Sequence, residues 1–131
     1  VTISDVSKPA LLVAEKNAHS LAANVKVMHS DLLSAYPYTP DIVLANLPYV
    51  DESWERSRDT RHEPSLALFA ENNGLSLIAK CFDQLSVRMK TGGIAIIEAD
   101  PRQWKTIDEY ATTAGFSADQ SRNYARAYRK N

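Results

Sequence analysis

The chain has 131 residues, which predicts a single domain long enough to bury a hydrophobic core. Fifteen Lys and Arg against sixteen Asp and Glu give a net charge of -1, which does not favour a sequence-independent nucleic-acid binder. The single cysteine excludes an internal disulfide and a four-cysteine metal site. No apolar run approaches the ~20 residues of a membrane span, and no secretory signal opens the sequence. We therefore expect a soluble, cytoplasmic protein.

Strand and helix signals alternate through the first half of the chain. Residues 1–4 form a β-branched run that ends at Asp5. Ser7 is a favourable helix N-cap, with Pro9 in the first turn of a helix whose apolar stripe extends to Leu21. A second short strand is predicted over 25–28. Residues 42–45 form a continuous apolar run, which predicts a strand covered on both faces.

The second half continues the alternation. A long amphipathic helix is predicted by the stripe Leu75, Ile78, Phe82, Leu85 and Met89 and ends at residues 91–93. A buried strand over 94–97 and a helix over 104–114 follow, and the tail from residue 116 alternates as two antiparallel edge strands do. This order predicts an α/β fold with a mostly parallel sheet and helices on both faces.

Polar residues gather where the predicted strands end, which is where ligands bind in open parallel sheets. Asp5 follows the first strand and could accept hydrogen bonds from both hydroxyls of a ribose, or could serve as a turn residue. Asp31 follows the second and could hold the exocyclic amine of an adenine, although an N-cap for residues 32–35 is the favoured interpretation. Glu98 ends the fourth strand.

The sharpest feature is Asn46-Leu47-Pro48-Tyr49, directly after the strand at 42–45. The Asn46 carboxamide and the Leu47 carbonyl, held outward by Pro48, present two close acceptors. Such a pair suits a planar NH2 group, because it takes both hydrogens and turns the nitrogen lone pair toward an electrophile. Tyr49 can stack on that planar group. The alternative is an Asn-x-Pro turn with Tyr49 in the core.

The remaining candidates favour structural roles. His19, His29 and His62 are isolated, so we predict no metal site, and Cys81 lies near the apolar stripe of a predicted helix. The basic tail is explained by a solvated strand edge, and the loop 51–65 carries more acids than arginines. These features do not indicate a phosphate-tracking surface.

Taken together, the motifs resemble one known family over nearly the whole chain, the HemK/PrmC-type protein-glutamine N5-methyltransferases. The residues that carry the resemblance are Asp5-Val6-Ser7, Ala10-Leu11, Ala14, Asn17-Ala18, Asp31-Leu32, Asp41-Ile42-Val43, Asn46-x-Pro48-Tyr49-Val50, Glu63-Pro64, Ala67-Leu68, Gly74-Leu75, Gly92-Gly93 and Gly115-Phe116. The resemblance implies a Rossmann-like, class I methyltransferase fold. It also implies S-adenosylmethionine as cofactor and methyl transfer to the glutamine side-chain amide in the Gly-Gly-Gln motif of peptide-chain release factors.

The resemblance also implies roles for single residues. Asp5 would bind the cofactor ribose, and Leu32, after Asp31, would border the adenine. Asn46, which also lies against the cofactor, and the Leu47 carbonyl would bind the substrate amide, while Pro48 and Tyr49 would shape its slot. Glu63 and Pro64 would lie near the bound substrate loop, and these two residues point to the glutamine branch of the amino-methylating enzymes.

The sequence departs from the family pattern in two places. Leu47 stands where the family usually has a second proline, and Asn-Leu-Pro-Tyr is familiar from ribosomal-RNA adenine dimethylases. The family's first strand and glycine-rich loop, and its helical N-terminal domain, have no counterpart here. We therefore expect residues 1–131 to be a partial catalytic domain belonging to a longer protein. Strand exchange with another copy, or repacking that joins the two strand edges, would also close the gap.

Two other functions stay open on the sequence. The first is an amino-methyltransferase acting on rRNA or DNA, favoured by Leu47. The second is a non-catalytic, methyltransferase-like module, favoured by the lack of a glycine-rich loop.

Overall fold

A computed structural model describes residues 1–51, 53–54 and 64–131. The chain divides into two compact units, Val1–Tyr38 and Thr39–Asn131, and each is described here by itself. The described strands form two sheets, one in each unit, and β1 and β3 are not joined in either of them.

The first unit is a parallel βαβ arrangement. Strand β1 (Thr2–Asp5) leads into helix α1 (Lys8–Ser20), and β2 (Lys26–His29) returns beside β1 with Asp5 opposite His29. Ser7 is the N-cap of α1, as predicted, and its hydroxyl accepts a hydrogen bond from the backbone N–H of Ala10 at 3.3 Å. Leu11 of α1 is buried in this unit.

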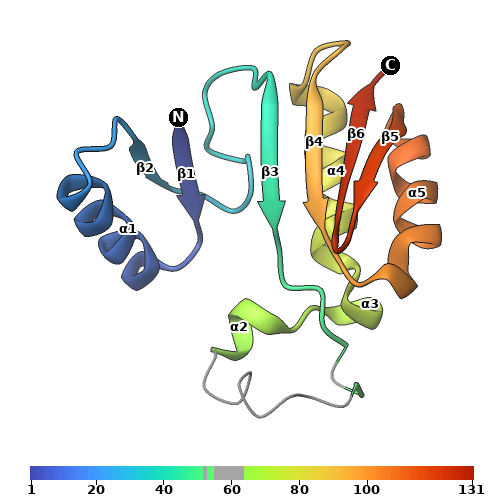
Figure 1. The fold of residues 1–131 in the computed structure, drawn as a ribbon, viewed down its shortest axis with the longest axis horizontal. Coiled ribbons are helices and arrows are strands. Elements are labelled where there is room, and N and C mark those ends of the chain that lie inside the picture. The colour runs from blue at the N-terminus through green and yellow to red at the C-terminus, as the bar shows by residue number, and fades with distance from the viewer. Residues whose placement is uncertain (52, 55–63) are drawn as a thin grey trace. The chain divides into compact units, whose positions relative to one another are not determined.

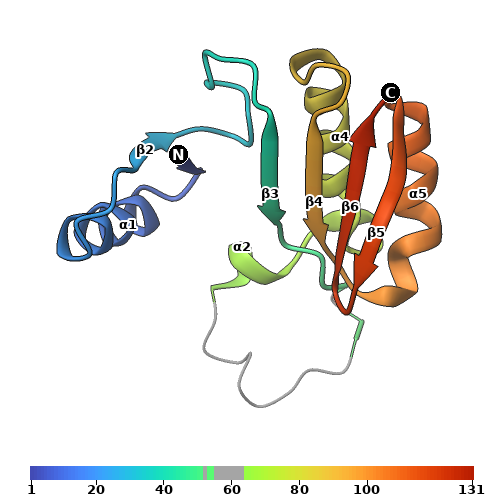
Figure 2. The ribbon, with the colours of Figure 1, turned by 45° about the horizontal axis from the view of Figure 1, so that its top comes forward.

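The second unit holds a four-stranded sheet in the order β3-β4-β6-β5 (Figures 1 and 2). Its strands are β3 (Ile42–Asn46), β4 (Ile94–Glu98), β5 (Phe116–Arg122) and β6 (Ala125–Lys130). The β3–β4 pair is parallel, whereas β6 runs antiparallel to both β4 and β5. The two parallel strands therefore have their carboxyl ends side by side, where Asn46 lies opposite Glu98. The tail forms two antiparallel strands as predicted, but only β5 of the two is an edge strand, because β6 is paired on both sides.

Helices α4 (Ser76–Arg88) and α5 (Trp104–Thr113) pack against the sheet of the second unit (Figure 1). All five apolar residues of the predicted 75–89 stripe are buried. The ring of Phe82 makes edge contacts with Phe116 and Tyr128, at centroid distances of 5.6 and 5.2 Å. These contacts fix α4 over the antiparallel end of the sheet.

Three short helical segments complete the second unit: α2 (Ser65–Leu68), α3 (Glu71–Gly74) and the 3-10 turn η2 (Pro101–Gln103). The sequence did not predict them, because segments this short carry no periodic apolar signal. All three are hydrogen-bonded to the chain that follows β3 or to one another, because Val50 bonds to Leu68 and Gln103 bonds to Tyr49 and Asn73. They therefore lie near the carboxyl end of β3.

One strand differs from its prediction. The run 42–45 does form β3, but Ile42 and Leu44 are 65% and 74% exposed. The reason is that Ile42 and Leu44 point to a face of the sheet that is left open within this unit, whereas Val43 and Ala45, which are half-buried, point to the opposite face. The interpretation of a strand covered on both faces is therefore wrong within this unit.

Candidate functional site

The first candidate site lies at the carboxyl end of β3. Asn46 is exposed and pairs in register with Glu98 of β4. The chain then turns through Leu47 and Pro48 to Tyr49, all of them half-buried. The exposed carboxamide of Asn46 leaves its side-chain oxygen available to a ligand, as the amide-binding interpretation requires.

Tyr49 is held beside the end of β4. Its hydroxyl donates a hydrogen bond to Glu98 Oε1 at 3.4 Å. Burial and the neighbouring Glu98 carboxylate raise the pKa of Tyr49, so the phenol stays protonated and remains a donor. Tyr49 therefore lies at the same carboxyl ends of β3 and β4 as Asn46.

A buried glutamine donates a hydrogen bond to the backbone of this segment. Gln103 is 5% exposed, and its Nε2 donates hydrogen bonds of 2.9 Å to the carbonyls of Tyr49 and Asn73. Gln103 was missed by the sequence reasoning. A local signal was present, since Asp100-Pro101-Arg102-Gln103 has the spacing of a capping box, and the structure forms one.

An exposed cation also lies near this edge. The Arg102 guanidinium stacks over the ring of Trp54 at 3.9 Å and forms two hydrogen bonds with the Asp100 carboxylate. The hydrogen bond from Arg102 holds the pKa of Asp100 below its usual value. Because its charge is matched by Asp100, Arg102 is not a free phosphate ligand.

The segment after Tyr49 is tied to α2. The Val50 N–H donates to the Leu68 carbonyl at 3.0 Å, and Val50 forms an isolated bridge with Phe69. Pro64 is exposed and takes the N-cap position of α2. The structure thus brings the element that begins after Pro64 to the candidate segment, whereas Glu63 lies outside the described residues, as does His62.

The second candidate site lies at the carboxyl end of the β1–β2 pair. Asp5 is exposed, and its Oδ1 accepts a hydrogen bond from the Ser7 N–H at 2.7 Å. The turn role is therefore present, while the carboxylate remains open to solvent. Asp5 also receives the Ser30 N–H on its backbone carbonyl at 3.1 Å, which joins the two strand ends.

Asp31 and Leu32 lie at the same edge. The Leu32 carbonyl accepts a hydrogen bond from the Ser4 hydroxyl at 3.4 Å, and Leu32 has a left-handed backbone with φ of +52°. Residues 32–35 form a turn rather than a helix, so the N-cap interpretation of Asp31 is wrong. The Ser30 hydroxyl, not Asp31, accepts the Ala35 N–H at 3.0 Å. Asp31 itself is exposed.

Three basic residues of the tail, all in β6, have partners within the second unit. Arg126 pairs with Asp108 at 2.7 Å, and Arg129 pairs with Asp119 at 2.8 Å. The Lys130 ammonium donates to the Ala114 carbonyl at 2.8 Å. These partners, rather than solvent alone, account for the cations of β6.

No helix in the described ranges is long and apolar enough to cross a membrane. No group of three or more His, Cys, Asp and Glu side chains in the same ranges is arranged to hold a metal ion.

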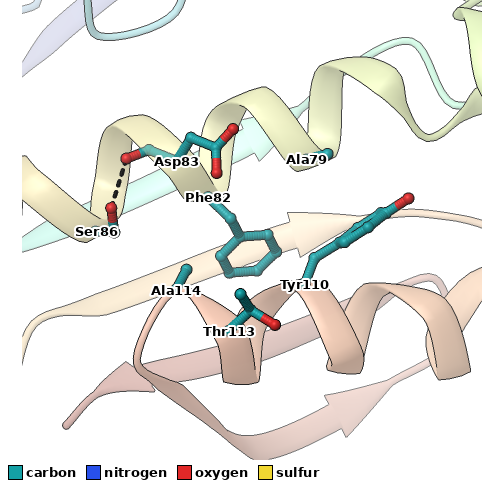
Figure 3. Close-up of a pocket in the computed structure, with 7 residues that line it drawn as sticks. All are labelled: Ala79, Phe82, Asp83, Ser86, Tyr110, Thr113 and Ala114. Atoms are coloured by element: carbon teal, nitrogen blue, oxygen red, sulfur yellow. Dashed lines mark hydrogen bonds between the residues drawn. The ribbon is translucent and has the colours of Figure 1, made fainter.

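A pocket of about 400 Å³ opens between α4 and α5. Figure 3 shows Phe82 and Tyr110 lining it, with Asp83 and Ser86 on the α4 side. The Ser86 hydroxyl there donates to the Asp83 backbone carbonyl at 2.6 Å. The pocket is lined by residues of α4 and α5 and by Ala114 just after α5, so it shares no residue with the strand-end sites.

Comparison with known proteins gives both sequence relatives and structural neighbours. The chain is 36% identical over 110 residues to the release factor glutamine methyltransferase of Lactococcus lactis, covering 82% of this chain and 41% of that protein. It is 34% identical over 121 residues to the protein of the same name from Borreliella burgdorferi, covering 89% and 42%. The chain thus spans about two fifths of the length of these curated relatives. No family model matches it.

The solved structures extend the comparison to the fold. A methyltransferase from Pyrococcus furiosus superposes with a TM-score of 0.70 at 15% identity, covering 98% of this chain and 59% of that one. A 16S rRNA N2 G1207 methyltransferase from T. thermophilus, solved with AdoMet and guanosine, gives 0.64 at 15% identity, covering 100% and 31%.

These neighbours define the class: the chain has the Rossmann-like fold of class I methyltransferases. In sequence, it is homologous over most of its length to the release factor glutamine methyltransferases. The family resemblance read from the motifs and the predicted α/β fold class are thereby confirmed.

Proposed function

We propose that the chain carries part of an S-adenosylmethionine-dependent methyltransferase that acts on the side-chain amide of glutamine in peptide-chain release factors. The observation that carries the proposal is Asn46-Leu47-Pro48-Tyr49 at the carboxyl end of β3, in a chain whose relatives bear the name release factor glutamine methyltransferase. On this proposal residues 1–131 belong to the catalytic domain, and the enzyme is cytoplasmic.

Asn46 and Leu47 bind and orient the substrate amide. The Asn46 Oδ1 and the Leu47 carbonyl each accept one N–H of the glutamine NH2 group, which directs the nitrogen lone pair away from these two oxygens. Pro48 holds the Leu47 carbonyl outward because its ring fixes φ. Pro48 and Tyr49 shape the slot for the planar amide, and Tyr49 stacks on it.

The transfer needs no strong base. When bound, S-adenosylmethionine would supply an electrophilic methyl group on a sulfonium. The nitrogen oriented by Asn46 and Leu47 would form the new N–C bond as the S–C bond breaks, and the electron pair of the S–C bond would stay on sulfur as a neutral thioether. The nitrogen would then release one proton to water. Asn46 contributes by holding the amide in line, which is where a positioned group lowers the barrier.

The hydrogen-bond acceptors at the carboxyl end of the β1–β2 pair fit such a cofactor. The Asp5 carboxylate is exposed and can accept hydrogen bonds from ribose hydroxyls, and that of Asp31 can accept from an adenine amine. Leu32 borders the adenine, and Asn46 lies against the cofactor as well as the substrate. Glu63 and Pro64 are proposed to contact the substrate loop, with Pro64 placed at the start of α2.

Methyl transfer from labelled S-adenosylmethionine tests the proposal. The protein is offered a release factor and ribosomal RNA in parallel reactions. We expect label in the release factor, on the glutamine of its Gly-Gly-Gln motif. Label in RNA alone would favour the nucleic-acid amino-methyltransferase that Leu47 suggests. Label in neither substrate would favour a non-catalytic module.

A further inference from the structure

The peptide unit that follows the candidate segment is held at both ends. Its carbonyl, on Tyr49, accepts a hydrogen bond from Gln103 Nε2 at 2.9 Å. Its N–H, on Val50, donates to the Leu68 carbonyl at 3.0 Å. A peptide unit is planar, so two opposed anchors fix its orientation.

Gln103 is itself firmly held. Its Nε2 also donates a hydrogen bond to the Asn73 carbonyl at 2.9 Å, and its Oε1 accepts a hydrogen bond from the Asp100 N–H at 3.1 Å. Both donors of the carboxamide are therefore used, and the side chain is 5% exposed. A buried amide with its donors satisfied is stiff, and losing it leaves the carbonyls of Tyr49 and Asn73 without this donor.

The backbone beneath Tyr49 is shaped for close approach. A Cβ on Gly74, whose φ is +78°, would lie 2.0 Å from the Tyr49 carbonyl oxygen. Asn72 and Asn73 both have left-handed backbones, with φ of +57° and +56°. Conformations of this kind persist only where the surrounding structure imposes them, and they are concentrated at functional sites.

We propose that Gln103 is a positioning residue that sets the geometry of the substrate-binding segment by holding the Tyr49 carbonyl against the Asn73–Gly74 turn. Asn46 fixes the start of that segment in the sheet, and Pro48 restricts its middle. Gln103 fixes its end, and with it the Leu47 carbonyl and the Tyr49 ring. This inference rests on the proposed function, but Gln103 contacts neither substrate nor cofactor in it.

The test is Gln103→Glu, which keeps an oxygen for the Asp100 N–H but loses both donors to the two carbonyls. We expect kcat for methyl transfer to release factor to fall about ten- to a hundredfold, as small misplacements of reacting groups do. The KM for S-adenosylmethionine should stay unchanged. Hydrogen exchange of the Val50 amide should accelerate about tenfold or more, because its peptide unit has lost an anchor.

Two further variants control this experiment. Gln120→Glu makes the same chemical change at an exposed position of β5 and should alter none of these quantities. Gln103→Met removes the donors without introducing a buried charge, and it replaces Gln103→Glu where thermal unfolding shows that the latter does not fold.

The outcomes separate the two proposals. Unchanged Val50 exchange in a folded Gln103 variant would overturn the positioning role, and so would accelerated exchange with unchanged kcat. Where the parent protein itself transfers no methyl group, the proposed function fails. The exchange measurement then decides alone whether Gln103 fixes the segment.

Discussion

Asn46 combines an exposed carboxamide with a backbone fixed in the sheet opposite Glu98. Removing the carboxamide should therefore damage function far more than folding. For Asn46→Ala we expect methyl transfer to release factor to fall on the order of a hundred- to a thousandfold, as loss of one positioned polar group at a reacting centre does. The rate of labelled methyl incorporation measures this.

Asn24→Ala is the matched control, since Asn24 is also exposed but precedes β2. It should keep the parent rate. Parent-like activity in Asn46→Ala would remove Asn46 from the reaction. A large fall in the thermal midpoint of Asn46→Ala alone would mean that its role is structural.

Single residues differ in how far the sequence could reveal them. Asn46 and Tyr49 were found because four adjacent residues follow a strand. Gln103 was not found, because its two carbonyl partners lie 54 and 30 residues away in the chain. A side chain that binds distant backbone leaves no pattern beyond its local capping box.

At the scale of elements, Gly74 and Gly92 make a matched pair, because only Gly74 has other atoms close to the position that a Cβ would take. Gly74 and Gly92 have similar left-handed backbones, with φ of +78° and +85°. A Cβ on Gly92 would meet nothing within 4 Å, whereas one on Gly74 would meet the Tyr49 carbonyl at 2.0 Å. Gly92→Ala should cost about 1–2 kcal/mol from backbone strain alone.

Gly74→Ala should lower the free energy of unfolding clearly more than Gly92→Ala does, because the clash with backbone adds to the same strain. Urea denaturation of both variants measures the difference. Equal losses would show that the turn at α3 can move away from Tyr49, which contradicts the tight approach described above.

The Tyr128 hydroxyl links β6 to α5 by a hydrogen bond. Because of this group, we expect the free energy of unfolding to fall as the pH rises in the alkaline range. The buried hydroxyl donates to Asp108 at 2.8 Å, and burial, then that carboxylate, raise its pKa well above the usual value. The raised pKa contributes stability that is present below about pH 10, the ordinary tyrosine value. This contribution is lost as the pH rises from there through the folded-state pKa.

Unfolding free energies at pH 9 and above measure this. The parent should lose up to about 1.4 kcal/mol per pH unit more than Tyr128→Phe, the slope for one proton. Tyr124→Phe, at a 53% exposed position, is the matched control for loss of a tyrosine hydroxyl. Identical slopes in the parent and Tyr128→Phe would mean that the hydroxyl titrates freely in the folded protein.

Among the elements, the long periodic ones were predictable. The stripe of α4 follows directly from apolar spacing, and the alternation around residues 124–128 favours the two tail strands; all of these elements form. The exposure of Ile42 and Leu44 could not be predicted, because it depends on which face of the sheet is covered within its unit. A continuous apolar run does not show whether both faces of its strand are covered.

At the scale of the whole molecule, the alternation of elements predicted an α/β fold with a mostly parallel sheet, and the family resemblance implied the Rossmann-like class. The structure describes that class as two compact units, each with polar residues at the carboxyl ends of its parallel strands. Composition and periodicity predict layers and elements. They do not predict a division into units, which depends on contacts between segments far apart in the chain.

The central claim is that this fold serves S-adenosylmethionine chemistry, and calorimetric titration with S-adenosylhomocysteine tests it most directly. We predict one-to-one binding to the protein. Asp5→Asn keeps an oxygen for the Ser7 N–H, so the turn before α1 should stay intact. It removes the charge offered to the ribose, so affinity should fall about tenfold or more. No binding by the parent protein, or equal binding by Asp5→Asn, would contradict the account.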